Sequence, residues 1–181
     1  MFSIKRISQI SCSIILVSLI LTNAYGQVEF TMSEKIKDNI SGFSIKKPVR
    51  WLDTFKNQGS DQRTLILSSN SENSGSAVNI LVFAQKPQSK NVGEYAKKLI
   101  GQYAKTYKEF ELTEKKAILL NDIPFSSFLI EYEFDGVKYK MNSIFTLQND
   151  KIYQINIIAP AEIYDNEINV INRVISTFEI S

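Results

Sequence analysis

The amino-acid sequence predicts an α+β domain built on a mostly antiparallel sheet. From Phe110 to Ile158, apolar and polar residues alternate with a period near two, which is typical of strands with one buried face. Two other segments, 91–107 and 165–178, instead repeat their apolar residues at helical spacing. The alternating stretch is divided by three pairs of turn-forming residues, which are Asn121-Asp122, Asp135-Gly136 and Asn149-Asp150.

The segment before the first helix predicts short strands. Residues 43–48 alternate apolar and polar side chains and end at a proline, so we expect a strand there and a turn over 49–51. Residues 63–67 predict a second strand, and the Ser/Asn/Gly run over 68–76 predicts a loop. Residues 77–83 are apolar on both faces at all but one position, which favours a central strand.

The first helix is expected to begin at Asn91. Its side chain can accept hydrogen bonds from free amides at a helix start, and Glu94 can reach back to it. Gly101 is expected on the outer, solvent-facing side of this helix. The inner arc comprises Val92, Ala96, Leu99, Ile100, Tyr103 and Tyr107, and the outer arc Glu94, Lys97, Lys98, Gln102 and Lys105.

Four strands and a second helix are expected to follow. Asp135-Gly136 is a strong hairpin signal because both residues tolerate positive φ. Pro160 ends the meander, and the helix begins near Asp165. The strands are expected at 111–120, 125–134, 137–147 and 151–158. On the third strand, one face is expected to carry Val137, Tyr139, Met141 and Phe145. The apolar arc of the helix is expected to comprise Ile168, Val170, Ile171, Val174, Ile175 and Phe178.

The first 26 residues have the layout of a secretory signal peptide. Lys5 and Arg6 form a basic start, residues 14–21 form a short uncharged apolar run, and Ala24-Tyr25-Gly26 places small residues before a cut at Gln27. The run is shorter than the roughly 20 apolar residues of a membrane-spanning helix. We therefore expect a signal peptide at 1–26, a polar lead-in at 27–41, a single domain at 42–181, and a final location in the periplasm or outside the cell.

Removal of this segment leaves a chain that lacks several side chains used in catalysis and carries no net charge. The only cysteine, Cys12, lies within it, outside any lipoprotein cleavage box, and the chain has no histidine. Of the 21 basic residues 19 remain, balanced by 19 acidic ones, which argues against a nucleic-acid partner. No Ser-x-x-Lys, Gly-x-Ser-x-Gly or glycine-rich phosphate loop is present. We expect a protein that is not an enzyme and has no cofactor or metal.

Two groups of charged residues allow a functional and a structural interpretation. Glu131 and Glu133, near Asp135, could recruit a hard cation or act as an acid/base pair, but a solvated strand face explains them more simply. The second group could dock an acidic partner or anionic lipid, or could serve only solubility. It comprises Lys97, Lys98, Lys105 and Lys108, expected on the outer side of the first helix.

Aromatic residues are assigned to packing. Trp51 could stack on a ligand, but a core anchor beneath the first turn is favoured. Tyr95, Tyr103 and Tyr107 fit packing of the helix better than a ligand site.

The order of these motifs resembles the family that joins the photosynthetic protein PsbP, the Ran-binding protein Mog1 and bacterial DcrB and DUF1795 domains. The resemblance covers roughly residues 42–180 and implies an α/β/α sandwich around a mostly antiparallel sheet, with no shared active site. Asn121-Asp122 departs from the commoner Asn-Gly. The matching motifs are Phe43-x-Ile45-x-x-Pro48-x-x-Trp51, Tyr95-Ala96, Phe110-Glu111-Leu112, Ala117, Asn121-Asp122-Ile123-Pro124, Ile152-Tyr153-Gln154-Ile155 and the closing segment from Asp165 to Ile175-Ser176-Thr177-Phe178.

Three functions are weighed against these observations. The first is an exported, non-enzymatic binding or accessory module that assists a protein assembly in the cell envelope, with a protein partner. The alternative is a small-ligand or lipid-binding protein with an apolar pocket between helix and sheet. A hydrolase acting through carboxylates is a third reading, and it requires two acids that face each other in a deep cleft.

Overall fold

The computed structural model describes residues 30–58, 62–69, 77–87, 89 and 91–181. Met32–Ser181 form a compact unit. The predicted signal peptide at 1–26 and residues 70–76 of the predicted loop lie outside the described residues.

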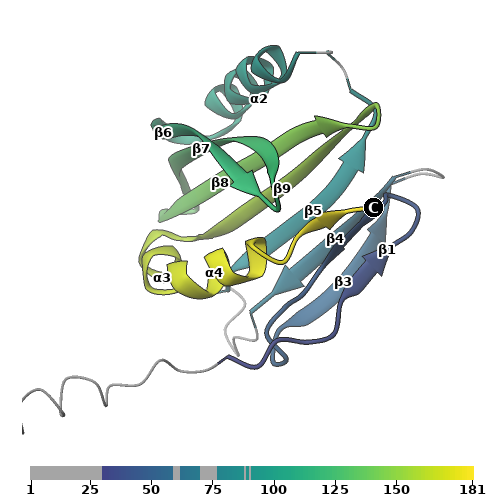
Figure 1. Ribbon diagram of the computed structural model, residues 1–181. Coiled ribbons are helices and arrows are strands. Elements are labelled where there is room, and N and C mark those ends of the chain that lie inside the picture. The colour runs from purple at the N-terminus through teal and green to yellow at the C-terminus, as the bar shows by residue number, and fades with distance from the viewer. Residues whose placement is uncertain (1–29, 59–61, 70–76, 88, 90) are drawn as a thin grey trace, which may run out of the picture. The chain divides into compact units, whose positions relative to one another are not determined.

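A seven-stranded antiparallel sheet forms the centre of this unit (Figure 1). The chain crosses from a middle strand to the far edge and returns as a meander, so that the last strand of the meander pairs with the strand that precedes the crossing. The predicted antiparallel α+β fold is therefore confirmed. In spatial order the strands are β3 (Leu52–Asn57), β4 (Arg63–Ser68), β5 (Asn79–Gln85), β9 (Lys151–Pro160), β8 (Val137–Gln148), β7 (Ile123–Phe134) and β6 (Lys108–Leu120).

Two-residue turns connect the strands of the meander. Asn121 and Asp122 have φ of 48° and 64°, Asp135 and Gly136 have 50° and 76°, and both residues of the third pair are also positive. Two consecutive residues with positive φ are typical of the type I′ turn, whose twist matches that of the flanking strands. All three turn pairs expected from the sequence therefore set the register of the sheet.

The first half of the chain differs more from expectation. β3 was not predicted because it is an edge strand in which only Phe55 is partly buried, so no alternation marks it. β5 begins two residues later than expected. The strand expected over 43–48 ends at Ile45, because the amide of Lys46 donates to Thr177 Oγ1 (2.9 Å) instead of to a neighbouring strand.

A second, three-stranded sheet comprises β1 (Ile36–Asp38), β2 (Phe43–Ile45) and β10 (Glu179–Ile180), in the order β1-β2-β10. β1 lies within the expected lead-in at 27–41, so part of that segment is structured. β10 was not predicted, because two residues carry no periodic signal.

Helix α2 (Val92–Thr106) begins as expected. Asn91 Oδ1 accepts from the amides of Gly93 (2.8 Å) and Glu94 (3.2 Å). Glu94 does not reach back to Asn91; Ser89 intervenes, accepting from the Asn91 amide and donating its hydroxyl to the Glu94 carboxylate. The expected inner arc is partly buried against the sheet, and Gly101 faces open space.

The single C-terminal helix expected near Asp165 is instead two helices, α3 (Ala161–Asn166) and α4 (Ile168–Ile175). Pro160 is the last residue of β9 and stands at the N-cap position of α3, so the helix begins earlier than expected. Glu167, at φ −96° and ψ 5°, separates the two helices. Phe178 is buried as expected but lies beyond the end of α4.

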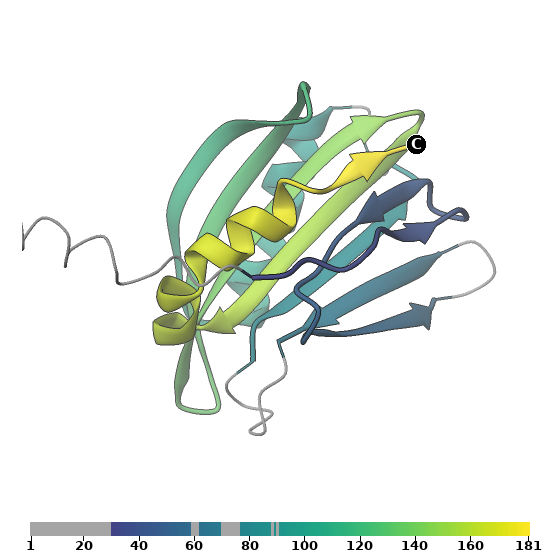
Figure 2. The same cartoon turned by 60° about the horizontal axis from the view of Figure 1, so that its bottom comes forward.

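The large sheet is covered on both faces. Figures 1 and 2 show α2 on one face and α4 on the other, and α4 shares its face with the small sheet. Successive residues of β8 enter different cores: Ile144 packs with α4 and Phe145 with α2. The implied α/β/α arrangement is thus present, with a small sheet added to one outer layer.

The position of Phe145 leads to a stability prediction. Phe145→Ala should lower the free energy of unfolding by about 3–5 kcal/mol, because the fully buried ring contacts both Tyr95 and Phe128. Chemical denaturation measures this loss. Leu119→Ala, at a side chain 70% exposed, is the control and should change stability by less than about 0.5 kcal/mol. Equal effects of the two substitutions would contradict the core assignment.

Candidate functional site

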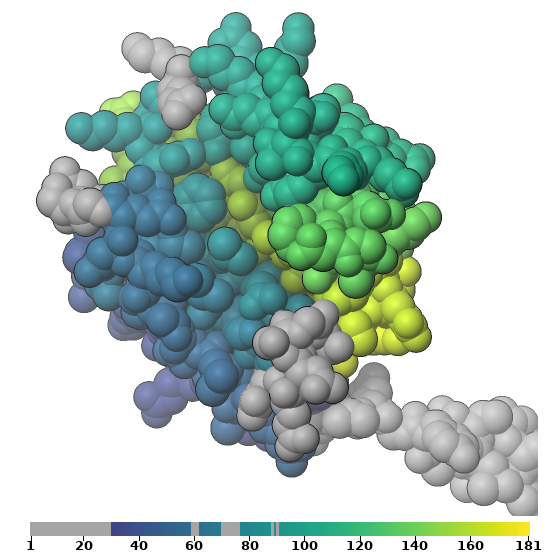
Figure 3. All heavy atoms as spheres, turned by 180° about the vertical axis from the view of Figure 1, so that it is seen from behind, coloured from purple at the N-terminus to yellow at the C-terminus, as the bar shows by residue number. Residues whose placement is uncertain are grey.

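A pocket of about 280 Å³ lies between α2 and the strands β4, β5 and β9. In Figure 3 the yellow-green of β9 is visible at its floor, between α2 above and the blue strands of the first half of the chain. Polar side chains predominate in the lining. The lining residues are Gln58, Gln62, Thr64, Leu81, Phe83, Gln85, Tyr95, Lys98, Leu99, Gln102, Tyr103, Gln154 and Asn156.

A chain of side-chain hydrogen bonds crosses the floor of the pocket. Gln85 Nε2 donates to the Tyr95 hydroxyl (2.9 Å), which donates to Gln154 Oε1 (2.5 Å). Gln154 Nε2 in turn donates to Asn156 Oδ1 (2.7 Å). The chain links α2 to β5 and β9, and it holds the two buried amides of β9 in defined orientations.

One polar atom of the lining has no partner within the protein. Thr64 is only 3% exposed, and its buried hydroxyl makes no hydrogen bond with any described residue. A buried hydroxyl without a partner costs free energy. Ser143 has a similarly unpartnered hydroxyl on β8 but does not line the pocket.

Electrostatically the pocket is close to neutral. No acidic residue is among the described residues of the lining, and Lys98 is the charged residue among them. Burial raises the pKa of Tyr95 to about 12 and also raises the pKa of Tyr103, so both phenols stay protonated at physiological pH. Apart from Lys98, the described lining therefore offers neutral donors and acceptors.

The structure divides the predicted lysine group. Lys97, Lys98 and Lys105 are exposed on α2, and Lys98 also lines the pocket. Lys108 was expected on the helix but is instead the first residue of β6, where it pairs with Glu133 of β7. The helix ends earlier because Tyr107 adopts extended backbone angles.

The predicted acidic group is matched by lysines on the neighbouring strand. Glu131 lies opposite Lys140 in the sheet, with 3.6 Å between Oε1 and Nζ, and Glu133 lies opposite Lys138. Lys140 also donates to both oxygens of Asp165 on α3, and these hydrogen bonds raise the pKa of Lys140. The contacts agree with the solvated strand face rather than with a cation site. Within the described part of the chain, no group of three or more metal-ligating side chains occurs.

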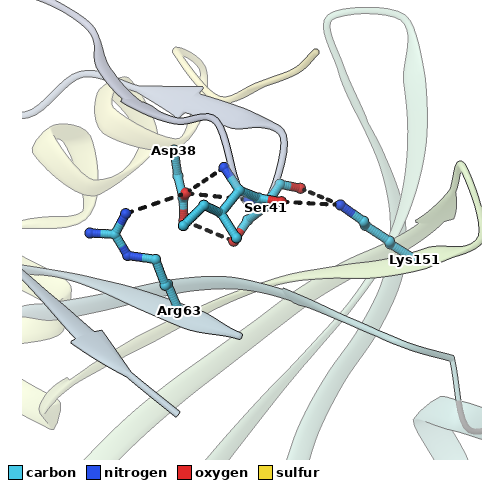
Figure 4. A network of polar contacts seen from close by, with 5 residues as sticks. Asp38, Ser41, Arg63 and Lys151 are labelled. Atoms are coloured by element: carbon cyan, nitrogen blue, oxygen red, sulfur yellow. Dashed lines mark hydrogen bonds and ion pairs between the residues drawn. The ribbon is translucent and has the colours of Figure 1, made fainter. Parts of the chain in front are cut away.

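A buried polar network joins the β1–β2 turn to the large sheet (Figure 4). Asp38 is 1% exposed and accepts from the Ser41 hydroxyl (2.8 Å) and from the amides of Ile40 and Ser41. Arg63 of β4 approaches the same carboxylate at 4.0 Å, and Lys151 of β9 donates to the carbonyls of Ile40 and Ser41. The network attaches the small sheet to β4 and β9.

Trp51 and Tyr107 pack as expected, whereas Tyr95 and Tyr103 also line the pocket. Trp51 is 7% exposed within the core on the α4 side, which confirms the packing role. Tyr107 stacks on Tyr132 with 4.0 Å between ring centroids. Tyr95 packs against Phe145 and also contributes its hydroxyl to the pocket, a second role that helical spacing does not reveal.

The alternative function expected a pocket between helix and sheet, but sequence reasoning expected it to be apolar and assigned no lining residues to it. A signal was present in β9, where Gln154 and Asn156 alternate with Ile155 and Ile157 in a strand with apolar neighbours on both sides. Alternation of this kind indicates one buried face but does not tell what covers the other. It becomes a polar patch under a helix only because α2 covers that face of the sheet.

No protein-family model matches the sequence, and no curated protein matches it significantly. Similarity appears among solved structures. CyanoP, the PsbP protein of the cyanobacterium Synechocystis, is 15% identical with a TM-score of 0.61, over 86% of this chain and 96% of that protein. LpqN, involved in cell envelope biogenesis of Mycobacterium tuberculosis, is 10% identical with a TM-score of 0.58, over 83% and 91%. A Mog1 variant is 10% identical with a TM-score of 0.55, over 81% and 95%.

The chain therefore has a PsbP/Mog1-like fold, as the resemblance implied. At these identities the similarity establishes the fold, and function has to be argued from the site. No helix in the described part of the chain has the length and apolar character needed to cross a bilayer.

The buried phenol of Tyr95 predicts a loss of stability at alkaline pH. Above pH 10 the unfolded chain loses this proton first, since the folded pKa is about 12, so the free energy of unfolding falls as pH rises through this window. Tyr95→Phe should reduce the fall in melting temperature between neutral pH and about pH 11. Identical pH profiles for the two proteins would contradict the assignment.

Proposed function

We propose that the protein is an exported, non-enzymatic binding module that assists a protein assembly in the cell envelope. The observation that carries this proposal is the composition of the pocket, whose described lining offers amides, hydroxyls and aromatic rings but no acid, thiol or imidazole. None of CyanoP, LpqN and Mog1 is described as an enzyme, and LpqN is involved in cell envelope biogenesis. Residues 1–26 direct export, and residues 42–181 act as one domain.

A protein partner docks, in this proposal, on the exposed lysines of α2 and the start of β6. Lys97 and Lys105 are exposed on the helix, and Lys108 extends the group onto the adjoining edge strand. Together with Lys98, these lysines outnumber the neighbouring acids Glu94 and Glu109, and the net positive charge favours a partner with an acidic surface and mainly affects the association rate.

Charge reversal tests this surface. Lys97→Glu with Lys105→Glu should reduce several-fold the amount of a specific partner captured from the native envelope fraction, because like charges then oppose docking. The matched control is Lys37→Glu with Lys56→Glu, which reverses two exposed lysines on β1 and β3. Capture that is unaffected by the α2 substitutions, or lowered equally by the control, would refute the lysine surface.

A second candidate function is small-ligand binding, favoured by the pocket and by the unpartnered Thr64 hydroxyl within it. The apolar pocket expected from the sequence is replaced by a polar one, so a lipid chain is a poor match for the lining.

Native mass spectrometry of the purified protein tests the second candidate. A bound molecule small enough for a cavity of about 280 Å³ should appear as an added mass that disappears on denaturation. A clean mass of the protein alone, in preparations from its native envelope, would count against a retained ligand.

A further inference from the structure

We propose that the pocket beneath α2 binds a neutral, polyhydroxylated ligand of about the size of a monosaccharide. This inference rests on the second candidate function, small-ligand binding, and names the chemical class of the ligand. Its basis is the arrangement of amides, aromatic rings and one unpartnered hydroxyl around the cavity.

The amide side chains match the chemistry of sugar hydroxyls. Each hydroxyl of a sugar both donates and accepts, and each glutamine or asparagine side chain presents two donor hydrogens and an acceptor oxygen. The lining contains six such side chains, so several ligand hydroxyls can be satisfied at once. They are Gln58, Gln62, Gln85, Gln102, Gln154 and Asn156.

These amides are distributed by depth. Gln154 and Asn156 are 1% and 8% exposed and form the floor, where their mutual hydrogen bond holds both side chains in one orientation. Gln58 and Gln102 are exposed and stand at the mouth, on the β3 side and on α2. A ligand thus meets oriented groups at the floor and adaptable groups at the entrance.

Thr64 marks an open hydrogen-bonding position. Its hydroxyl is buried beside the cavity without a partner, an arrangement that costs stability in the protein alone. Because Thr64 also lines the cavity, a rotation of its side chain that brings the hydroxyl to the cavity surface would let a ligand hydroxyl supply the missing partner. The neighbouring ring of Phe83, which pairs with Thr64 in the sheet, supplies an apolar surface for the carbon face of a sugar.

Charge and size exclude other ligand classes. A phosphate or other strong anion would meet a single described cation, Lys98, at the mouth rather than a cluster. An alkyl chain would leave the floor amides facing hydrocarbon, which is unfavourable. A volume of about 280 Å³ is slightly below the range of pockets for drug-sized molecules, and it suits one sugar ring.

Saturation-transfer NMR and calorimetric titration test the proposal on the purified, exported protein. The probes are D-glucose and N-acetyl-D-glucosamine, with octanoate and inorganic phosphate as the apolar and anionic alternatives. Saturable binding of at least one sugar, and weaker binding of octanoate and phosphate, is the expected result. Binding of octanoate or phosphate alone overturns the inference but leaves small-ligand binding in place; binding of no probe, with a clean native mass, overturns both.

Matched variants locate the binding. Thr64→Val should weaken sugar binding by about threefold to tenfold, while raising or maintaining the melting temperature, because it removes an unpartnered hydroxyl. Thr146→Val makes the same change at a buried threonine of β8 on the other face of the sheet, outside the lining, and should leave affinity unchanged. Equal effects of both substitutions on affinity would overturn the assignment.

A second pair of variants does not depend on the buried floor. Gln102→Ala at the exposed mouth should weaken sugar binding without affecting folding, because alanine is a good helix former. Lys105→Ala, on the same helix and outside the lining, is its control. Undiminished affinity in Gln102→Ala together with undiminished affinity in Thr64→Val would place the ligand elsewhere and overturn the inference.

Discussion

The rest of the structure depends on the pairing of β9 with β5 and β8. β9 is the last strand of the meander, and its pairing with β5 joins the meander to the first half of the chain. Its two faces have different chemistry. Ile155 and Ile157 contribute to the core on the α4 side, whereas Gln154 and Asn156 face α2. One strand therefore supplies both the apolar contacts that stabilise the fold and the polar floor of the candidate site.

Two buried polar groups, the Asp38 carboxylate and the Thr64 hydroxyl, differ in whether the protein supplies their hydrogen-bond partners. The Asp38 carboxylate is satisfied by three donors from its own turn and is approached by Arg63, so this network serves to attach the small sheet. The Thr64 hydroxyl is equally buried but unpartnered within the described chain. Buried polar groups in folded proteins normally have partners. The contrast separates a polar cluster completed by the protein from one that a ligand can complete.

Much of the fold was predictable because its signals are local. Type I′ turns need residues that tolerate positive φ, and the pairs Asn121-Asp122 and Asp135-Gly136 are of this kind and can be recognised from the sequence. Asn91 likewise marks the start of α2. β3 carries no comparable signal, since an edge strand with little burial lacks alternation. Helix α3 and its separation from α4 were also not predicted, because the expected helix began near Asp165 and the six residues of α3 are too few to show a helical period.

The sequence by itself determined an antiparallel meander, a capped helix and a chain without histidine, because turns, caps and periodicity are properties of neighbouring residues. Only the tertiary structure decided which polar strand face lies beneath α2 and which faces solvent. Gln154 on β9 and Glu131 on β7 both alternate with apolar residues, yet one becomes the floor of a pocket and the other an ion-pair partner of Lys140. The reason is that the layer covering each face comes from a distant part of the chain, which no local pattern encodes.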